Sequence, residues 1–236
     1  MGLETREHKV YLQVIADGTI RKVVPEGTPG CVKRVYEDRE TKEEKHKFEM
    51  VFDAVNGIVG QVTLKKGKFG DQLIIPITDG DENFNLALST QQNYGEDFMK
   101  KMPNINFDKK VRLSPFSFTS DAGKIIRGID VRQDWNPHEP VTADNGNKIP
   151  SNYFDKENKK NINGYPDPEG NTKEFSTDDW KIYFAQARKF LVTDLKSKDL
   201  IVDAATAGTS NGVAAKEIVP EGGDGPDVDE NGNETF

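Results

Sequence analysis

The sequence predicts a mainly β protein whose centre is a five-stranded barrel, and two observations support this prediction. Apolar residues alternate at period two through 58–88 and again through 110–132, which is the spacing of half-buried strands joined by turns. Between these two blocks, residues 93–102 change to helical spacing and end at Pro103. Three strands, one helix and two strands is the order of the OB-fold, a five-stranded Greek-key barrel.

The elements of this barrel are separated by turns rich in Gly and Asp, as turns between strands usually are. The helix is indicated by Tyr94, Phe98 and Met102, which lie four residues apart and form one apolar stripe that would hold the helix on the barrel. The expected strands cover residues 58–66, 73–77, 84–88, 110–118 and 124–132.

Short apolar runs before the barrel predict an N-terminal β extension. Gly and Pro turns and one charged stretch separate them, so each run is a strand of its own. We expect the OB-fold core at about 45–135 and a single domain, core plus extension, over 1–140. The four runs cover residues 8–15, 20–24, 31–36 and 47–55.

The C-terminal third changes character twice. Residues 141–175 are polar, with few apolar anchors, and predict a linker or long loop. Residues 176–200 predict an amphipathic helix that begins at Ser176, with Asp179 as its capping partner, and that docks on the barrel. Phe175, just before the cap, is placed to pack against Trp180.

Residues 201–236 predict a disordered acidic tail. They carry a net charge of -7 out of the -8 of the whole chain, so the rest of the protein is close to neutral. The segment is rich in Gly and Asn and holds too little apolar area to offset the entropy of ordering it. Its last residue is the aromatic Phe236.

Composition excludes several classes of protein. The mean hydropathy is -0.71, no apolar run approaches the roughly 18 residues of a membrane span, and the N-terminus lacks an apolar signal core. A single cysteine, Cys31, allows no internal disulfide, and three scattered histidines, His8, His46 and His138, build no zinc site on their own. We therefore expect a cytoplasmic protein without metal or cofactor.

Sequence motifs of enzymes are also missing. The chain has no phosphate-binding glycine loop, no dinucleotide fingerprint, no Gly-x-Ser-x-Gly and no His-Glu-x-x-His. The acidic cluster at 79–82 lies between two expected strands, where Asp and Gly usually form a solvated turn. We expect a protein without catalytic residues.

The fourth expected strand carries the strongest functional pattern. Its alternation places cations and aromatic rings on one face and apolar residues on the other. Exposed rings beside cations can stack on nucleic-acid bases while the cations contact phosphates. The alternative is that the rings are covered by the C-terminal helix or the N-terminal strands, since aromatic residues in strands are usually core. The first face holds Lys110, Arg112, Ser114, Phe116 and Phe118, and the second holds Val111, Leu113 and Pro115.

Further cations surround this strand in the expected barrel. The tip of the first hairpin combines Lys65, Lys66 and Lys68 with Phe69, on a loop that borders the binding groove of an OB-fold. Lysine-rich turns are also common as plain solvated turns. The fifth strand adds Lys124 and Arg127, although strict alternation places Arg127 on the opposite face, and Trp135 beyond it could stack a base or close the barrel end.

The tail provides a second candidate site. Acidic residues beside a terminal ring can mimic a polyanion with a base, so such a tail can occupy a cationic groove or dock on a partner protein. The alternative is a tail that only confers solubility. The expected partner-binding residues are Asp227, Asp229, Glu230, Glu234 and Phe236.

Several stretches together resemble bacteriophage single-stranded DNA-binding proteins over roughly residues 45–135. The resemblance implies an OB-fold protein that coats replicating single strands and recruits replication enzymes, such as a polymerase or helicase, through its acidic tail. In bacterial counterparts a proline precedes the last phenylalanine, and here Thr235 stands in that place. The stretches are KFGDQL at 68–73, LALST at 86–90, YGEDFMKKMPNI at 94–105, LSPFSF at 113–118 and GKIIRG at 123–128.

The resemblance and the residues together predict a sequence-tolerant single-stranded DNA-binding protein of phage-type replication, recombination or repair, located in the host cytoplasm. Stacking and phosphate contacts carry no base-edge information, which is why sequence tolerance is expected. The alternative is a phage virion or protein-interaction β-barrel that binds no nucleic acid.

Overall fold

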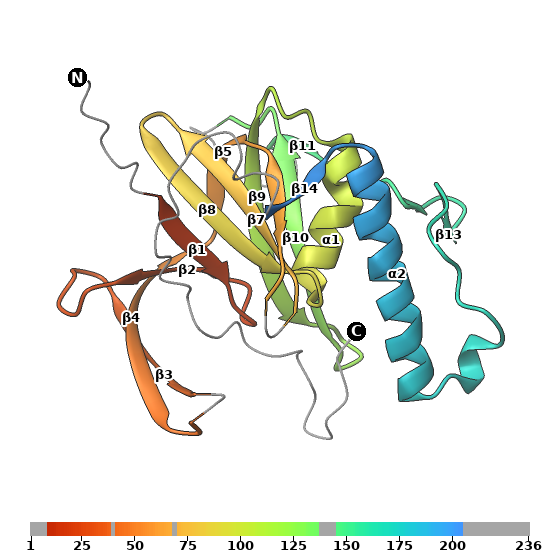
Figure 1. The fold of residues 1–236 in the computed structure, drawn as a ribbon, viewed down its shortest axis with the longest axis horizontal. Coiled ribbons are helices and arrows are strands. Elements are labelled where there is room, and N and C mark those ends of the chain that lie inside the picture. Colours follow the sequence, from red (N-terminus) through yellow and green to blue (C-terminus); the bar gives the residue numbers. More distant parts are fainter. Residues whose placement is uncertain (1–8, 39–40, 68–69, 137–144, 205–236) are drawn as a thin grey trace.

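The computed structural model describes residues 9–38, 41–67, 70–136 and 145–204, and over these residues the protein is mainly β (Figure 1). The two α-helices are α1 (Asn93–Lys101) and α2 (Thr177–Ser197). A 3-10 turn at Met102–Asn104 extends α1, and a second 3-10 turn at Thr172–Glu174 precedes α2. The strands are β1 (Val10–Val14), β2 (Ile20–Val24), β3 (Val32–Glu37), β4 (Glu44–Phe52), β5 (Val55–Val59), β6 (Val62–Lys65), β7 (Gln72–Asp79), β8 (Glu82–Ser89), β9 (Lys110–Thr119), β10 (Ile125–Gln133), β11 (Asn147–Lys148), β12 (Phe154–Asp155), β13 (Lys160–Asn161) and β14 (Ile201–Asp203).

The predicted order of three strands, one helix and two strands is confirmed, with one refinement. The first strand is interrupted at Gly60 and Gln61 and forms two pieces, β5 and β6. The main sheet runs in the order β11-β10-β9-β5-β7-β8-β1-β2-β4-β3, and β6 pairs with both β7 and β14. The four strands expected before the barrel are also confirmed, as β1 to β4.

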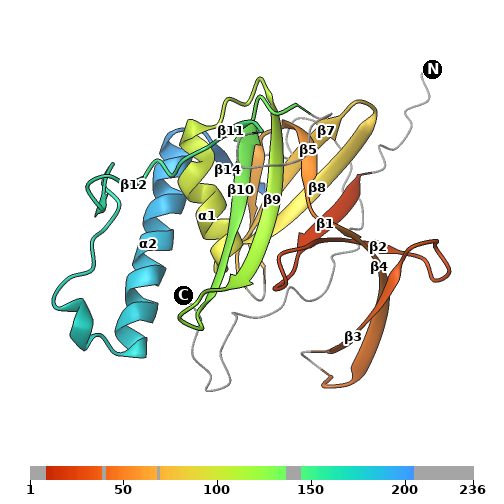
Figure 2. The ribbon, with the colours of Figure 1, turned by 180° about the vertical axis from the view of Figure 1, so that it is seen from behind.

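A closed barrel, which the sequence predicted, is not formed. The outer edge of β8 pairs in parallel with β1, with Leu12 opposite Leu86, and no ladder joins β8 to β10 within the described residues. β9 and β10 pair along their whole length, from Ile125 opposite Thr119 to Gln133 opposite Val111. The sheet is therefore open at the place where a five-stranded barrel would close (Figure 2).

The free edge of β10 is satisfied by other parts of the chain. The carboxylate of Asp97 on α1 accepts the backbone N–H of Ile129 at 2.8 Å, and the ammonium of Lys101 donates to the Ile129 carbonyl at 2.5 Å. Asp97 and Lys101 also form an ion pair at 2.8 Å. Two residues further along β10, the carbonyl of Val131 accepts the N–H of Ile149. Buried backbone groups need such partners, and here α1 supplies them from its side chains.

Pro115 sits in the middle of β9, where a proline is unusual because it donates no backbone hydrogen bond. Its cross-strand partner is Ile129, whose N–H and carbonyl both turn away from β9 toward α1. On the other side of β9, the ladder to β5 ends at Leu113. No neighbour therefore requires an N–H at this position, and the strand continues through it.

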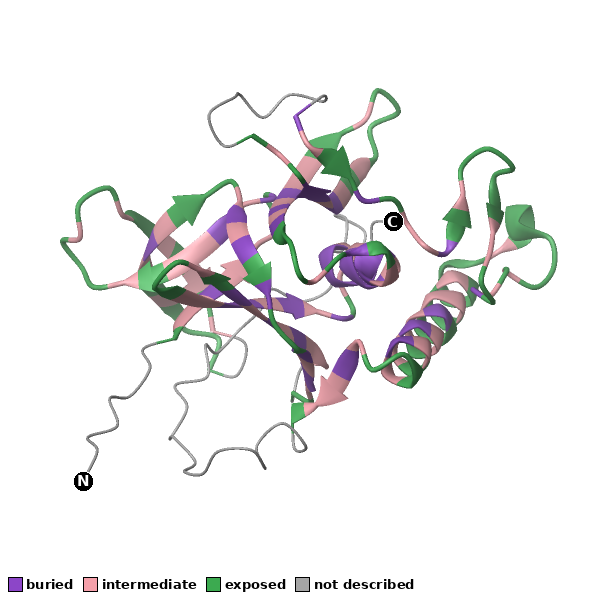
Figure 3. Ribbon diagram, turned by 90° about the horizontal axis from the view of Figure 1, so that it is seen from above, coloured by how far each residue is buried: buried purple, intermediate pink, exposed green. Residues whose placement is uncertain are grey.

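The core lies between the sheet and α1. Tyr94, Phe98 and Met102 are buried, as their four-residue spacing predicted, and they meet buried residues of β7 to β10 such as Ile75 and Val131. Figure 3 shows buried positions alternating with lighter ones along the strands and covering much of α1. This alternation is the period-two pattern that the sequence shows.

Helix α2 begins as predicted. Ser176 and Asp179 form a capping box, and the rings of Phe175 and Trp180 lie 5.0 Å apart. The helix buries Leu191 and Leu195 and packs against α1 and β14. No helix in the described part of the chain is long and apolar enough to cross a membrane.

Two segments near the C-terminus differ from the prediction. The expected polar linker contributes three buried hydrophobic residues, Ile149, Tyr153 and Tyr165, over its described residues 145–175. The Tyr165 hydroxyl donates to Glu96 of α1 at 3.1 Å, so the loop is fastened to the core. The acidic tail was expected from residue 201, but Ile201–Asp203 form β14, because Ile201 finds a buried place beside β6. Residues 205–236 lie outside the described part.

Strands β2, β4 and β3 form an arm that projects from the main sheet (Figure 1). We call these three strands the N-terminal arm. Glu49 is fully buried in it and is neutralised by Arg34 at 3.0 Å and Lys47 at 3.1 Å. Burying a carboxylate is tolerable only with such partners. Arg34 and Lys47 are therefore used within the arm.

We expect Asp97→Ala to lower the free energy of unfolding by about 1–3 kcal/mol, because it leaves the buried Ile129 N–H without its acceptor and removes the ion pair of Lys101. Urea titration measures this loss. The matched control is Asp121→Ala in the exposed β9–β10 turn, which should leave stability unchanged. Equal stability of the two variants would contradict the role of α1 at this edge.

Candidate nucleic-acid interface

The two faces of β9 are arranged as the sequence predicted. Val111, Leu113 and Pro115 are buried against the core, while Lys110 and Phe118 are exposed. We call the face that carries Lys110, Arg112, Ser114, Phe116 and Phe118, with its neighbours on β10 and β5, the outer face. No helix of the described residues buries Phe118, which keeps 53% of its surface exposed.

Phe116 and Phe118 form a stacked pair on the outer face. Their ring centroids are 6.0 Å apart and their planes are inclined by 30°. Opposite them on β10 stand Gly128 and Ile126, and Ile126 is 40% exposed. The result is a small apolar surface beside the β9–β10 turn, which contains the exposed Lys124.

Phe116 is partly covered, so the alternative that other parts of the chain cover the rings applies in part to this residue. A side chain at Gly128 would meet the Phe116 ring at 2.7 Å, so the missing side chain leaves room for the ring to lie across β10. The turn between β1 and β2 approaches from the other side, where a Cβ on Gly18 would reach the Phe116 backbone at 2.7 Å. Phe116 is therefore held in place, and Phe118 is the ring open to a ligand.

The cations predicted for this site have different surroundings. Lys110 is exposed but pairs with Asp79 at 2.6 Å. Arg112 is half-buried, and its Nε is shielded from water without a hydrogen-bond partner among the described residues. Lys65 is half-buried and Lys66 is exposed at the end of β6, whereas Lys68 and Phe69 lie outside the described residues.

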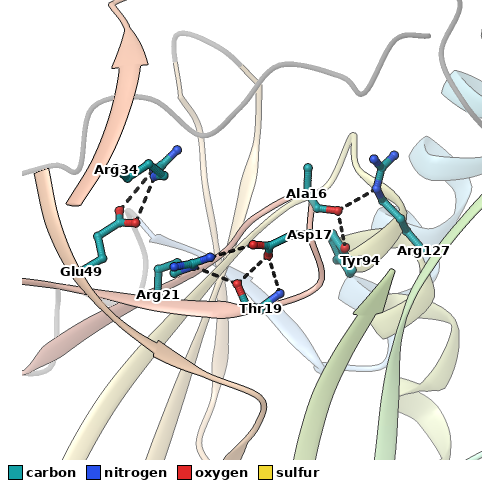
Figure 4. A network of polar contacts seen from close by, with 8 residues as sticks. All are labelled: Ala16, Asp17, Thr19, Arg21, Arg34, Glu49, Tyr94 and Arg127. Carbon is teal, nitrogen blue, oxygen red and sulfur yellow. Dashed lines mark hydrogen bonds and ion pairs between the residues drawn. The ribbon is translucent and has the colours of Figure 1, made fainter. Parts of the chain in front are cut away.

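Arg127 does not join the outer face. It has the opposite parity on β10, and its Nε donates to the carbonyl of Ala16 at 3.0 Å, which also accepts the Tyr94 hydroxyl at 3.3 Å (Figure 4). Arg127 also lines a cleft between α1 and α2, of about 280 Å³, together with Arg188. It holds the β1–β2 turn against the core. The sequence had placed Arg127 among the DNA-binding cations, although its alternation put the residue on the opposite face.

An acidic residue interrupts the outer face between its aromatic and cationic parts. Asp130 lies opposite Ser114 and forms ion pairs with Arg132 at 2.5 Å and Lys148 at 3.0 Å. Burial raises the pKa of Asp130, but hydrogen bonds and charge from Arg132 and Lys148 lower it by more, so the pKa lies below its ordinary value of 3.8.

A cleft of about 360 Å³ opens at the far end of β9 from the phenylalanine pair. Trp135, two residues beyond β10, is one of its walls, and sequence reasoning had left the role of this ring open. The structure adds three residues that the sequence did not indicate, Asn56 of β5, Lys109 before β9 and Asp134 after β10. The cleft is lined by Asn56, Asp79, Lys109, Lys110, Asp134 and Trp135.

The predicted partner-binding residues of the tail, from Asp227 to Phe236, all lie outside the described residues. Comparisons with protein-family models, with curated proteins and with solved structures find no match for this chain. The chemistry of the site therefore rests on the residues themselves.

We expect the ion pairs of Asp130 to give a stability contribution that depends on pH. Because the pKa of Asp130 is lower in the folded protein than the ordinary 3.8, this contribution is complete above that value and is lost as the pH falls through the folded pKa. Asp130→Asn should therefore be less stable than the wild type at about pH 6, and the gap should narrow by about pH 3. Urea unfolding at both pH values measures it.

The control for this experiment is Asp121→Asn, which makes the same change in an exposed turn and should show no gap at either pH. A gap for Asp130→Asn that is the same at both pH values would mean that the carboxylate charge contributes nothing.

Proposed function

We propose that this protein binds single-stranded DNA without sequence preference and without catalysis, as a coating protein of phage-type replication, recombination or repair. The observation that supports this function best is Phe118, which is 53% exposed on the outer face of β9 and stacks on Phe116. An exposed ring on a rigid strand is a stacking platform that accepts any base, because every base has a π-face.

We further propose that the fold derives from the OB-fold. Four ladders support this origin: β5 with β7, β7 with β8, β5 with β9 and β9 with β10, with α1 inserted before β9. In this protein β1 and α1 take up the edges that close a barrel elsewhere, and the outer face of β9 stays accessible.

Stacking rather than net charge would provide most of the affinity. Lys110 is paired with Asp79, and Arg132 and Lys148 are paired with Asp130, so few cations of the outer face are uncommitted. Phosphate contacts would come from Lys66, Lys124 and Arg112, with about 0.7 added to the log–log salt slope for each neutralised phosphate. Replication proteins, such as a polymerase or a helicase, would be recruited through the acidic tail.

A second candidate function is protein interaction, and the N-terminal arm favours it. The arm exposes several apolar side chains, of which Val23 at 53%, Val35 at 52% and Val32 at 42% have the largest exposed fractions. Exposed apolar residues gathered on one element mark contact surfaces more often than isolated ones do. A virion or interaction protein of this kind would show no oligonucleotide binding in the titration below.

We expect Phe118→Ala to weaken binding of oligo-dT by about 1–3 kcal/mol, the contribution of one stacked base. Thermal stability should be kept, because half of this ring is already exposed. The measurement is fluorescence anisotropy of a labelled oligonucleotide. The control is Phe154→Ala, which removes a ring of similar exposure, 41%, from β12. Unchanged affinity of Phe118→Ala, or no binding by the wild type, would remove the stacking platform.

Deleting residues 221–236 removes six acidic residues and should raise affinity for oligo-dT at low salt. A tethered tail competes with DNA at an effective concentration that reaches about the millimolar range, and the competition should fade as salt screens it. Phe236→Ala keeps all six acidic residues and serves as the control. Its tail should still compete with DNA almost as strongly as the wild-type tail, but its binding to the polymerase or helicase should be lost. Identical DNA affinity of the truncated protein at low salt, together with unchanged partner binding, would reduce the tail to a solubility device.

A further inference from the structure

We infer that the cleft bounded by Trp135 and Asn56 is a nucleobase pocket, in which the indole ring stacks a base of the bound strand. This inference rests on the proposed single-stranded DNA binding and assigns a second subsite to the same outer face. A volume of about 360 Å³ is at the small end of ligand sites, which span roughly 300–1,000 Å³.

Trp135 is held by an ordered turn. Asp134 has a φ of 56°, which reverses the chain directly after β10, and Lys109 and Asn147 bind its carboxylate at 2.9 and 3.2 Å. A Cβ on Gly146 would meet the Trp135 Cβ at 2.8 Å, so this glycine lets the next segment pack tightly against the turn. A non-glycine residue in the left-handed region persists only where its surroundings enforce it, and such places are often functional.

The charges of the cleft favour a base over a phosphate. Its two lysines each have an aspartate partner inside the same cleft, Lys110 with Asp79 at 2.6 Å and Lys109 with Asp134 at 2.9 Å. The hydrogen bond from Lys109 holds the pKa of Asp134 below its ordinary value, so this carboxylate stays charged. A phosphate entering here would be repelled by two carboxylates, whereas an uncharged ring would not be.

Asn56 adds a polar atom that lacks a partner. Its Oδ1 is shielded from water and accepts no hydrogen bond from the described residues. Buried polar atoms are nearly always paired. Since Asn56 also lines the cleft, its oxygen is an uncommitted acceptor beside the proposed base. Every base carries an N–H on its Watson–Crick edge, so one acceptor here is compatible with binding any sequence.

The pocket and the phenylalanine pair lie on one strand. Lys110 at the cleft and Phe118 are eight residues apart on β9, which corresponds to about 26 Å of extended chain. A strand of several nucleotides can therefore contact both subsites, within the roughly 4–16 nucleotides that OB-folds cover.

The chain contains two tryptophans, which makes a direct test practical. Trp180→Phe leaves Trp135 as the only indole, and Trp135→Phe leaves Trp180, on α2, as a matched reporter outside the cleft. Each variant is titrated with a labelled oligo-dT, and label anisotropy reports binding while indole emission reports stacking. We expect strong quenching in Trp180→Phe and none in Trp135→Phe. An oligonucleotide of abasic sites should not quench either.

Affinity gives the second measurement. Trp135→Ala should weaken oligo-dT binding by about 5- to 150-fold, the equivalent of one stacked base, with the salt slope unchanged because no phosphate contact is lost. Trp135→Phe should recover part of the affinity, and Asn56→Leu should lose affinity at the same salt slope. The Lys124→Ala variant, by contrast, should flatten the slope.

The outcomes separate the two proposals. Wild-type binding by anisotropy with an unquenched Trp135 and full affinity of Trp135→Ala would overturn the pocket and leave the proposed function in place. A flatter salt slope in Trp135→Ala would also overturn it, because the cleft would then hold a phosphate. No anisotropy change with the wild type would overturn the proposed function, and the pocket with it.

Discussion

The backbone of Ile129 needs hydrogen-bond partners outside the ladder to β9, and the side chains of Asp97 and Lys101 provide them. Much of the architecture depends on this contact. It fixes α1 along the edge of β10, so that Phe98 enters the core. With that edge occupied, the edge of β8 is open to β1, whose following turn reaches back to Arg127. A helix and an added strand thus replace the direct pairing that closes a barrel.

This arrangement explains why the outer face of β9 combines rigidity with accessibility. The strand is paired on both sides, with β10 and with β5, and its proline lies where no donor is required. Gly128 lets Phe116 lie flat across the sheet, and Phe118 projects beside it. Under the proposed function, a ring held in this way would lose little rotamer freedom when a base stacks on it, so more of the stacking energy would be left for binding.

Local sequence patterns predicted most of the helices and strands, but they could not predict which distant segments contact one another. The alternation of 110–118 assigned both faces of β9, and Ser176 with Asp179 marked the start of α2, because these signals act within a few residues. The parallel pairings of β1 with β8 and of β14 with β6 join segments far apart in sequence, without a local signal for either. The cleft was missed for the same reason: Asn56 and Trp135 meet only through the fold.

The charges of the outer face bear on how a single strand would lie under the proposed function. Asp130 stands in the middle of the face, neutralised by Arg132 and Lys148, and Lys110 is neutralised by Asp79. A phosphate laid on the sheet would meet these carboxylates at close range, which is unfavourable. The bases would therefore face the sheet, where they would contact Phe118 and the cleft. The phosphates would face the solvent. In that orientation the net charge of the domain matters little for affinity, and a nearly neutral protein can bind a polyanion.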